Sequence, residues 1–266
     1  MHSHTGYVAH GRGTVQELVQ AAVDAGLTTL GITEHNWLSD AIDPTHWVGM
    51  LQSNVERYLA DIRSAREQFP QITLLAGMEM DYLGSTEDRQ ITDQDLAPFD
   101  YLLGSVHYLD GWPMYSRKVL DAWKDQEAVD AIWRRYFEVW CEAAAGKGPY
   151  TIMSHPDLVK KHGLYPSFNV EPLYRQAAEA AAAGGRMVEV NTSGTLYPCK
   201  QMFPAPELLA QFAHAGVPCT VGTDAHCSEN VARHITQAYA YLYQAGYRQV
   251  SVPLPGGDRR SIDLEG

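Results

Sequence analysis

The first residues of the chain, His2-Ser3-His4-Thr5, carry two imidazoles at alternate positions. In an extended segment, side chains two residues apart point to the same side, so both rings are aimed at one point. A third histidine, His10, follows closely. The neutral imidazole is the commonest metal ligand in proteins because it offers a lone pair near neutral pH. The spacing therefore indicates a divalent metal site, although two neighbouring histidines alone do not establish one.

Similar side chains recur where predicted strands end. Short apolar and β-branched runs predict strands over 27–33, 72–80, 101–106, 150–154, 186–190 and 217–222. All but one of these runs lead into a histidine, a glutamate or an aspartate, and the exception, before Asn191, leads into amides and hydroxyls. Together with the first three histidines, the candidate metal ligands are His2, His4, His10, His35, Glu79, His107, His155, Asp224 and His226.

These seven imidazoles and two carboxylates exceed the roughly four ligands that one tetrahedral zinc ion needs, and they suffice for two or three divalent ions. Mixed nitrogen and oxygen ligands suit zinc, iron or manganese. A carboxylate such as Glu79 can bridge two ions and hold a hydroxide between them, and ion pairs about 3.5–4 Å apart are the usual apparatus of phosphoester hydrolysis. Taken singly, Asp224 also fits a helix N-cap and His107 a buried core histidine. The recurrence at strand ends favours the metal site.

The elements that must position these groups alternate between strand and helix. Thr14-Val15-Gln16-Glu17 has the form of a capping box, and Gly26 is placed to end the helix that follows. Further helices are predicted over about 50–69, 126–145, 170–183, 206–215 and 229–245, with an edge strand over 249–254. Counting the first histidine segment, the alternation occurs seven times, which predicts parallel strands with helical crossovers. We expect a single α/β domain over 1–266, closed into a barrel with its active site at the C-terminal strand ends.

The composition argues against several other classes of protein. The formal net charge of −12 disfavours a broad nucleic-acid surface, whereas metal ions in a pocket would still admit an anionic small substrate. No apolar run approaches the ~20 residues of a membrane span, and no secretory signal is evident, so a cytoplasmic location is expected. The four cysteines form no C-x-x-C pair and are expected to be reduced thiols.

The ordered motifs resemble the PHP (polymerase and histidinol phosphatase) family. They are H-x-H from His2, H-G-x-G-T from His10, T-E-H ending at His35, G-x-E-x-D around Glu79, G-S-V-H ending at His107, S-H-P-D around His155 and G-T-D-A-H around Asp224. The resemblance covers nearly the whole chain and is closest to the monofunctional histidinol-phosphate phosphatases. It implies a distorted (β/α)₇ TIM-like barrel. Only Met1 precedes the first histidine pair, so the first strand is expected to be very short.

The resemblance also implies a set of metal ligands and a reaction. One ion would be held by His2, His4, Glu79 and Asp224, a second by Glu79, His107 and His155, and a third by His10, His35 and His226. The implied reaction is hydrolysis of a phosphomonoester, L-histidinol phosphate, by a metal-bridging hydroxide, in histidine biosynthesis. Glu79 would serve catalysis by bridging two ions, and Asp224 or His226 would pass a proton to the leaving oxygen.

Substrate contacts away from the ions are less constrained by the sequence. Lys160, just after His155-Pro156-Asp157, is the favoured phosphate-binding residue. The weaker candidates are Lys161, Arg12 and Arg117. Glu34 and Asp81 either receive the ammonium or imidazole of an aminoalcohol substrate or orient ligand histidines.

Three alternatives remain open from the sequence. The first is a PHP phosphoesterase acting on a sugar phosphate, a nucleotide or phosphotyrosine. The second is an amidohydrolase-type barrel that cleaves C–N bonds, against which we find no lysine at a strand end. The third is a non-catalytic metal-binding or nucleic-acid-associated module, which the acidic net charge disfavours. The sequence does not indicate the oligomeric state.

Overall fold

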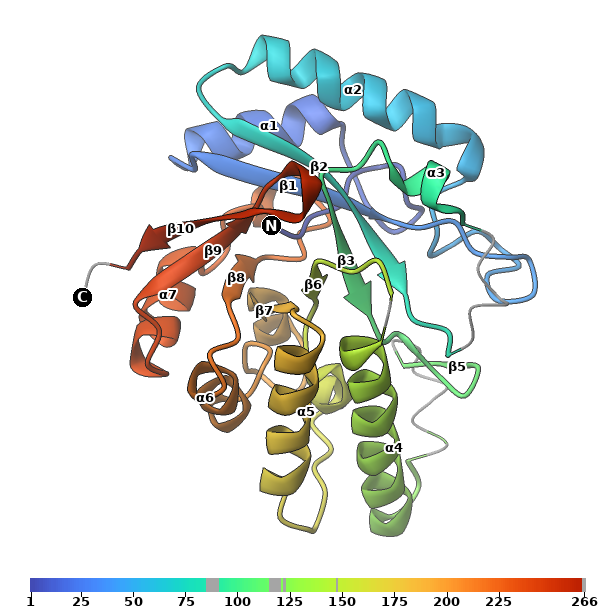
Figure 1. The fold of residues 1–266 in the computed structure, drawn as a ribbon. Coiled ribbons are helices and arrows are strands. Elements are labelled where there is room, and N and C mark those ends of the chain that lie inside the picture. The colour runs from blue at the N-terminus through green and yellow to red at the C-terminus, as the bar shows by residue number, and fades with distance from the viewer. Residues whose placement is uncertain (85–90, 115–120, 122, 147, 265–266) are drawn as a thin grey trace.

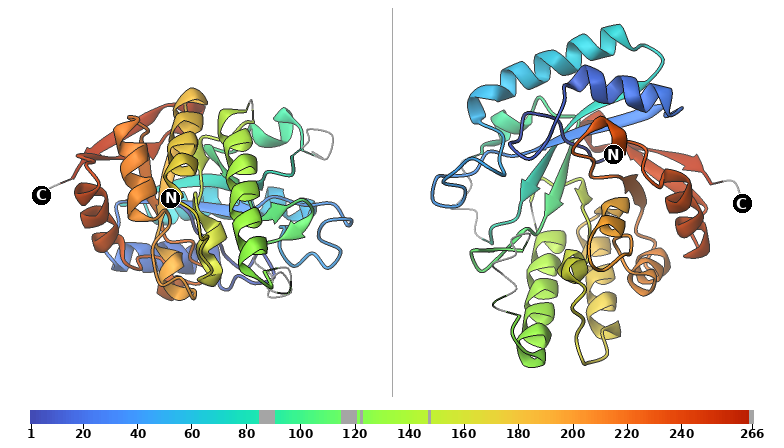
Figure 2. Two further views of the ribbon diagram at one scale, coloured as in Figure 1. Left: turned by 90° about the horizontal axis from the view of Figure 1, so that it is seen from below. Right: turned by 180° about the vertical axis from the view of Figure 1, so that it is seen from behind.

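The computed structural model describes residues 1–84, 91–114, 121, 123–146 and 148–264. Six strands form one sheet in the order β1-β2-β3-β6-β7-β8, and every neighbouring pair is parallel. The strands are β1 (Thr29–His35), β2 (Thr73–Asp81), β3 (Tyr101–Ser105), β6 (Ile152–Met153), β7 (Met187–Asn191) and β8 (Cys219–Gly222). The sheet is curled, with its helices on the outside (Figure 1; Figure 2). The predicted α/β class and the parallel strands are thus confirmed.

The helices follow the strands around the sheet. They are α1 (Val15–Asp24), α2 (Val55–Gln68), the short α3 (Asp93–Leu96), α4 (Gln126–Ala145), α5 (Glu171–Ala183), α6 (Pro206–His214) and α7 (Ile235–Gln244). Helix α1 begins at the predicted capping box, in which Thr14 accepts from the Glu17 backbone and Glu17 accepts from the Thr14 backbone. Figure 1 shows α1 and α2 together beside β1 and β2, with α4, α5 and α6 along the later strands.

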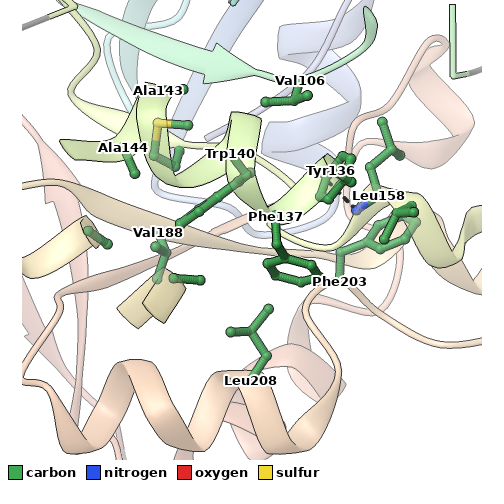
Figure 3. Close-up of a cluster of buried hydrophobic side chains, with 14 of the residues drawn as sticks. Val106, Tyr136, Phe137, Trp140, Ala143, Ala144, Leu158, Val188, Phe203 and Leu208 are labelled. Atoms are coloured by element: carbon green, nitrogen blue, oxygen red, sulfur yellow. Dashed lines mark hydrogen bonds between the residues drawn. The ribbon is translucent and has the colours of Figure 1, made fainter. Parts of the chain in front are cut away.

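The largest hydrophobic cluster lies between the later strands and their helices. Phe137 and Trp140 of α4 point toward Val188 of β7 and Leu208 of α6 (Figure 3), and all four side chains are fully buried. Burying a side chain of this size contributes about 1.5–3 kcal/mol. This packing holds β6 and β7 in place and so fixes the positions of the residues at their ends.

The first residues of the chain lie between the two edges of the sheet. On one side, the Thr33 amide of β1 donates to the Ser3 carbonyl at 2.8 Å. On the other side, the Asp224 amide donates to the His2 carbonyl at 2.9 Å, and Ser3 forms a parallel bridge with Ala225. The expected short first strand is therefore a single bridge in the structure, and this segment links β1 to the residues after β8.

Two predicted helices differ from the observed ones. The helix over 50–69 begins later, at Val55, after the 3₁₀ turn η1 (Gln52–Asn54). The prediction of a helix over 229–245 was wrong in its first half. This part contains the 3₁₀ turn η6 (Ser228–Asn230) and His234, whose backbone is left-handed with φ of 56°. The carbonyls of Val231 and Arg233 accept hydrogen bonds from the hydroxyls of Thr223 and Thr192, and the positive φ of His234 interrupts the helical backbone.

The chain ends in an antiparallel hairpin, and a second hairpin follows β3. The predicted edge strand is β9 (Gln249–Pro253), and it pairs with the unpredicted β10 (Arg259–Asp263). The other hairpin joins β4 (Tyr108–Leu109) to β5 (Trp112–Pro113). The four cysteines are free, as expected. Among the described residues, none of the helices combines the length and apolar character that crossing a bilayer requires.

Candidate metal centre

The nine predicted ligand residues meet at the carboxyl end of the parallel sheet. His35 and Glu79 are partners in register on β1 and β2, and His107, His155 and Asp224 follow β3, β6 and β8. Most of these side chains are buried, and only His10, Asp224 and His226 are partly exposed. Parallel strands end at one edge of a sheet, which is why residues far apart in the sequence converge here.

Four donor atoms form a compact set around one point. His2 Nε2 lies 3.1 Å from His4 Nε2 and 3.2 Å from Glu79 Oε2. His4 Nε2 lies 3.4 Å from both Glu79 Oε2 and Asp224 Oδ1, and His2 Nε2 lies 3.6 Å from Asp224 Oδ1. Ligands about 2.0–2.2 Å from a tetrahedral ion lie roughly 3.3–3.6 Å from one another. The five distances are therefore close to those expected between ligands of one metal ion.

A second compact set uses the other carboxylate oxygen of Glu79. Glu79 Oε1 lies 3.4 Å from His107 Nε2 and 3.1 Å from His155 Nε2, and the two histidine nitrogens are 3.1 Å apart. Because Oε2 faces the first set and Oε1 the second, Glu79 has the arrangement of a bridging ligand. The two sets are compatible with two neighbouring divalent ions.

The remaining three histidines lie next to the first set. The rings of His10 and His226 are 4.6 Å apart, and those of His10 and His35 are 5.3 Å apart. His10 Nδ1 donates to the Trp47 carbonyl and His226 Nδ1 to the Asp224 carbonyl, which leaves the Nε2 lone pair of each ring for a ligand role. His226 Nε2 is buried without a hydrogen-bond partner among the described residues. A cation would satisfy this atom.

Carboxylates lie behind three of the histidine rings. Glu189 Oε1 lies 3.0 Å from His2 Nδ1, Asp81 Oδ1 lies 2.8 Å from His107 Nδ1, and Glu34 Oε2 lies 3.9 Å from His4 Nδ1. Such carboxylates fix the tautomer and orientation of a ligand histidine. For Asp81, this placement favours the ring-orienting role over direct contact with the substrate. Glu34 Oε2 is beyond hydrogen-bond distance of the His4 ring, and Glu34 Oε1 accepts from the amide and the hydroxyl of Thr5.

Glu189 is the functional residue that the sequence reasoning missed. It is fully buried, and besides His2 it accepts from the His155 backbone amide at 3.1 Å and the Asn191 side chain at 3.0 Å. The sequence feature that could have identified it is a single acidic residue within the apolar strand β7 (Met187–Asn191). Glu189 alternates with Asn191 and therefore points to the same side of the strand.

The titration behaviour of the centre suits cation binding. Burial raises the pKa of Glu79, but the surrounding imidazoles, led by His2, outweigh this effect and hold it well below its ordinary value. The pKa of Asp224 is lowered in the same way. Burial, with the charge of nearby Glu79 opposing it, lowers the pKa of His35 to about 4. His4 behaves differently, because burial lowers its pKa but hydrogen bonds with Asp224 and Glu79 outweigh burial and raise it to about 9. At neutral pH the centre thus offers ionised carboxylates, while a ring such as His4 holds a proton that a metal ion would displace.

A cavity of about 150 Å³ opens above these groups. Its wall combines six of the candidate ligands with five other side chains, which are Trp47, Val48, Leu158, Lys161 and Tyr197. Lys161 therefore has access to a bound substrate, and its Nζ lies 4.2 Å from the centre of the Tyr197 ring.

The structure corrects the predicted preference for Lys160. This side chain is fully buried, its ammonium lies 2.9 Å from Asp157 Oδ2, and it donates to the Met202 carbonyl at 2.8 Å. Its charge is already matched inside the protein, which argues against a role in phosphate binding. Arg12 is exposed at the surface, where its amide donates to the His226 carbonyl. Arg117 lies outside the described residues.

Comparison with known proteins places the chain in a family. Residues 1–193 match the PHP domain. A protein of Deinococcus radiodurans named "Probable histidinol-phosphatase" is 30% identical over 252 residues, which cover 94% of both chains. A histidinol-phosphatase of Lactococcus lactis subsp. lactis (strain IL1403) is 24% identical over 260 residues, covering 94% of this chain and 92% of the relative.

A solved structure shares the fold. It is the crystal structure of histidinol phosphate phosphatase from Lactococcus lactis subsp. lactis Il1403, complexed with Zn, L-histidinol and phosphate. The TM-score is 0.79 at 23% identity, and the match covers 97% of each chain. From the extent of the domain match and the identity to the Deinococcus relative, we conclude that this chain belongs to the PHP domain family.

Proposed function

We propose that this protein is a metal-dependent phosphomonoester hydrolase that converts L-histidinol phosphate to L-histidinol and phosphate. The names of the relatives supply the substrate. The observation that carries the proposal is the position of Glu79, whose two oxygens face two separate sets of histidines. A carboxylate shared in this way is the feature that a paired-ion phosphoesterase needs.

The proposed cofactors are two or three divalent ions of zinc, iron or manganese. One would be held by His2, His4, Glu79 and Asp224, one by Glu79, His107 and His155, and one by His10, His35 and His226. Zinc is supported by the name of the solved relative. When bound, such ions supply a water of lowered pKa and neutralise charge on the phosphoryl oxygens.

The chain's own residues would hold and orient the reacting groups. Asp81 and Glu189 keep the rings of His107 and His2 in position through hydrogen bonds. Lys161, from the cavity wall, binds a phosphoryl oxygen and stabilises its negative charge. Asp224 and His226 line the same cavity, where either would relay a proton from solvent to the leaving alkoxide of the substrate.

We also propose that the chain forms one domain and a distorted (β/α)₇ barrel. The parallel sheet would supply six of the seven barrel strands. The segment around Ser3, hydrogen-bonded to both edges of the sheet, would count as the seventh.

Phosphate release from a panel of monoesters tests the proposal. We expect L-histidinol phosphate to be hydrolysed with a higher kcat/KM than sugar phosphates, nucleotides or phosphotyrosine, and a chelator to abolish turnover. Protein with confirmed metal content that releases phosphate from none of these esters would refute the phosphatase assignment. A strong preference for another ester would instead move the assignment to that substrate.

A further inference from the structure

The side chain of Trp47 stands at the mouth of the cavity. Trp47 is 54% exposed, yet it lines the cavity beside the candidate metal ligands. Its ring lies 6.1 Å from the ring of His10, with 27° between the two planes. A large aromatic surface that remains open to solvent beside a binding site is suited to contact with a ligand.

The loop that carries Trp47 is held in place by a buried carboxylate. Asp43 is 5% exposed and accepts from three consecutive backbone amides, those of Trp47 at 2.9 Å, Val48 at 2.8 Å and Gly49 at 2.9 Å. The loop is also joined to β1, because the Met50 amide donates to the His35 carbonyl at 3.1 Å. The indole is therefore presented by a preformed loop, which lowers the entropic cost of using it in binding.

The position of Trp47 in the cavity, relative to the donor atoms that would bind phosphate, decides which part of a substrate the indole can contact. The phosphoryl group must reach the donor atoms around Glu79, which is buried below the cavity. His10 is one of the more exposed members of the cluster, and Trp47 stacks beside it on the outer side. The alcohol portion of a monoester bound at the floor would extend toward this outer wall.

We propose that Trp47 is a specificity-determining residue that stacks on a flat heteroaromatic ring in the alcohol portion of the substrate. The proposal rests on the phosphatase function proposed above and specifies how this site would select esters that carry such a ring. Stacking between two aromatic groups contributes beyond simple burial, and a cationic ring such as imidazolium gains further from the indole face. Small aliphatic monoesters would lack this contact.

The test compares Trp47→Leu with wild-type holoenzyme. We expect the KM for L-histidinol phosphate and the inhibition constant of L-histidinol to rise about five- to tenfold, because both ligands carry the ring. The inhibition constant of inorganic phosphate and the metal content should stay unchanged, because phosphate has no ring. Trp47→Phe should recover part of the lost affinity.

The matched control is Trp112→Leu, which removes a 64% exposed tryptophan that lies outside this cavity and should change none of these constants. An unchanged KM and L-histidinol inhibition constant in Trp47→Leu would overturn the inference, and so would an equal rise in the inhibition constant of phosphate. Wild-type enzyme that fails to hydrolyse L-histidinol phosphate would instead overturn the proposed function. The two failures are therefore distinguishable.

Discussion

His2 and Glu189 form a buried pair in which the ring Nδ1 lies 3.0 Å from the carboxylate Oε1, while the ring Nε2 lies 3.1 Å from His4 Nε2. The carboxylate accepts the ring proton at Nδ1 and so leaves the Nε2 lone pair directed at the centre. The same arrangement recurs between Asp81 and His107. The geometry of the candidate centre therefore depends on acids that are not themselves in either compact ligand set.

The first prediction concerns Glu189. Glu189→Gln keeps the size of the side chain but removes its charge, so the variant should bind divalent metal about 10–100-fold more weakly. Metal affinity would be measured by competition with a chelating dye. Glu207→Gln, which changes an exposed acid at the start of α6, is the control and should bind metal normally. Equal affinities in the two variants would show that Glu189 does not orient His2.

The second prediction concerns Glu79. Glu79→Gln removes the charge that faces both ligand sets, so the protein should lose metal and nearly all turnover. Elemental analysis and phosphate release would be measured on the same preparation, with circular dichroism to confirm that it is folded. A folded variant with wild-type metal content and activity would exclude the bridging role.

The third prediction separates two adjacent lysines. Lys161→Met should raise the KM for the phosphomonoester and leave metal content unchanged, because this lysine lines the cavity. Lys160→Met should instead lower the free energy of unfolding by roughly 3–5 kcal/mol, because it leaves buried Asp157 without its partner. Steady-state kinetics and urea denaturation on both variants provide the comparison. The assignment fails if Lys160→Met raises KM while Lys161→Met has normal kinetics.

The fourth prediction is a pH dependence that arises from Lys161. Burial lowers the pKa of this ammonium below its ordinary value of 10.5. Phosphate binding needs the protonated form, so KM should begin to rise at a pH below that of a free lysine and should stay constant on the acidic side of this pKa. Lys161→Arg, which keeps its charge to higher pH, should shift the rise in KM upward. A KM profile that is the same for lysine and arginine would assign the effect to another group.

Much of the fold followed from local signals in the sequence. The bounds of α4 (Gln126–Ala145) were predicted, because the apolar pattern of the helix ends at the Gly146–Pro149 break. The break before α7 was not predicted, and the hydroxyls that bond to this segment belong to Thr192 and Thr223, which lie outside it in the sequence.

Part of the candidate site could also be predicted from the sequence. The strand-end residues could be found because parallel strands bring their carboxyl ends together. Glu189 lies inside its strand, and its contact with His2 depends on the N-terminal segment lying between the sheet edges. Lys160 and Lys161 sit on one 3₁₀ turn, η4 (Leu158–His162), whose backbone decides which of them faces the cavity. The sequence alone does not contain that orientation.

Anomalous X-ray diffraction from crystals of catalytically active protein tests the central claim most directly. Data collected at the zinc, iron and manganese absorption edges would locate any bound ions. We predict one peak among His2, His4, Glu79 and Asp224, and a second among Glu79, His107 and His155. Active crystals without anomalous density at either position would contradict the account.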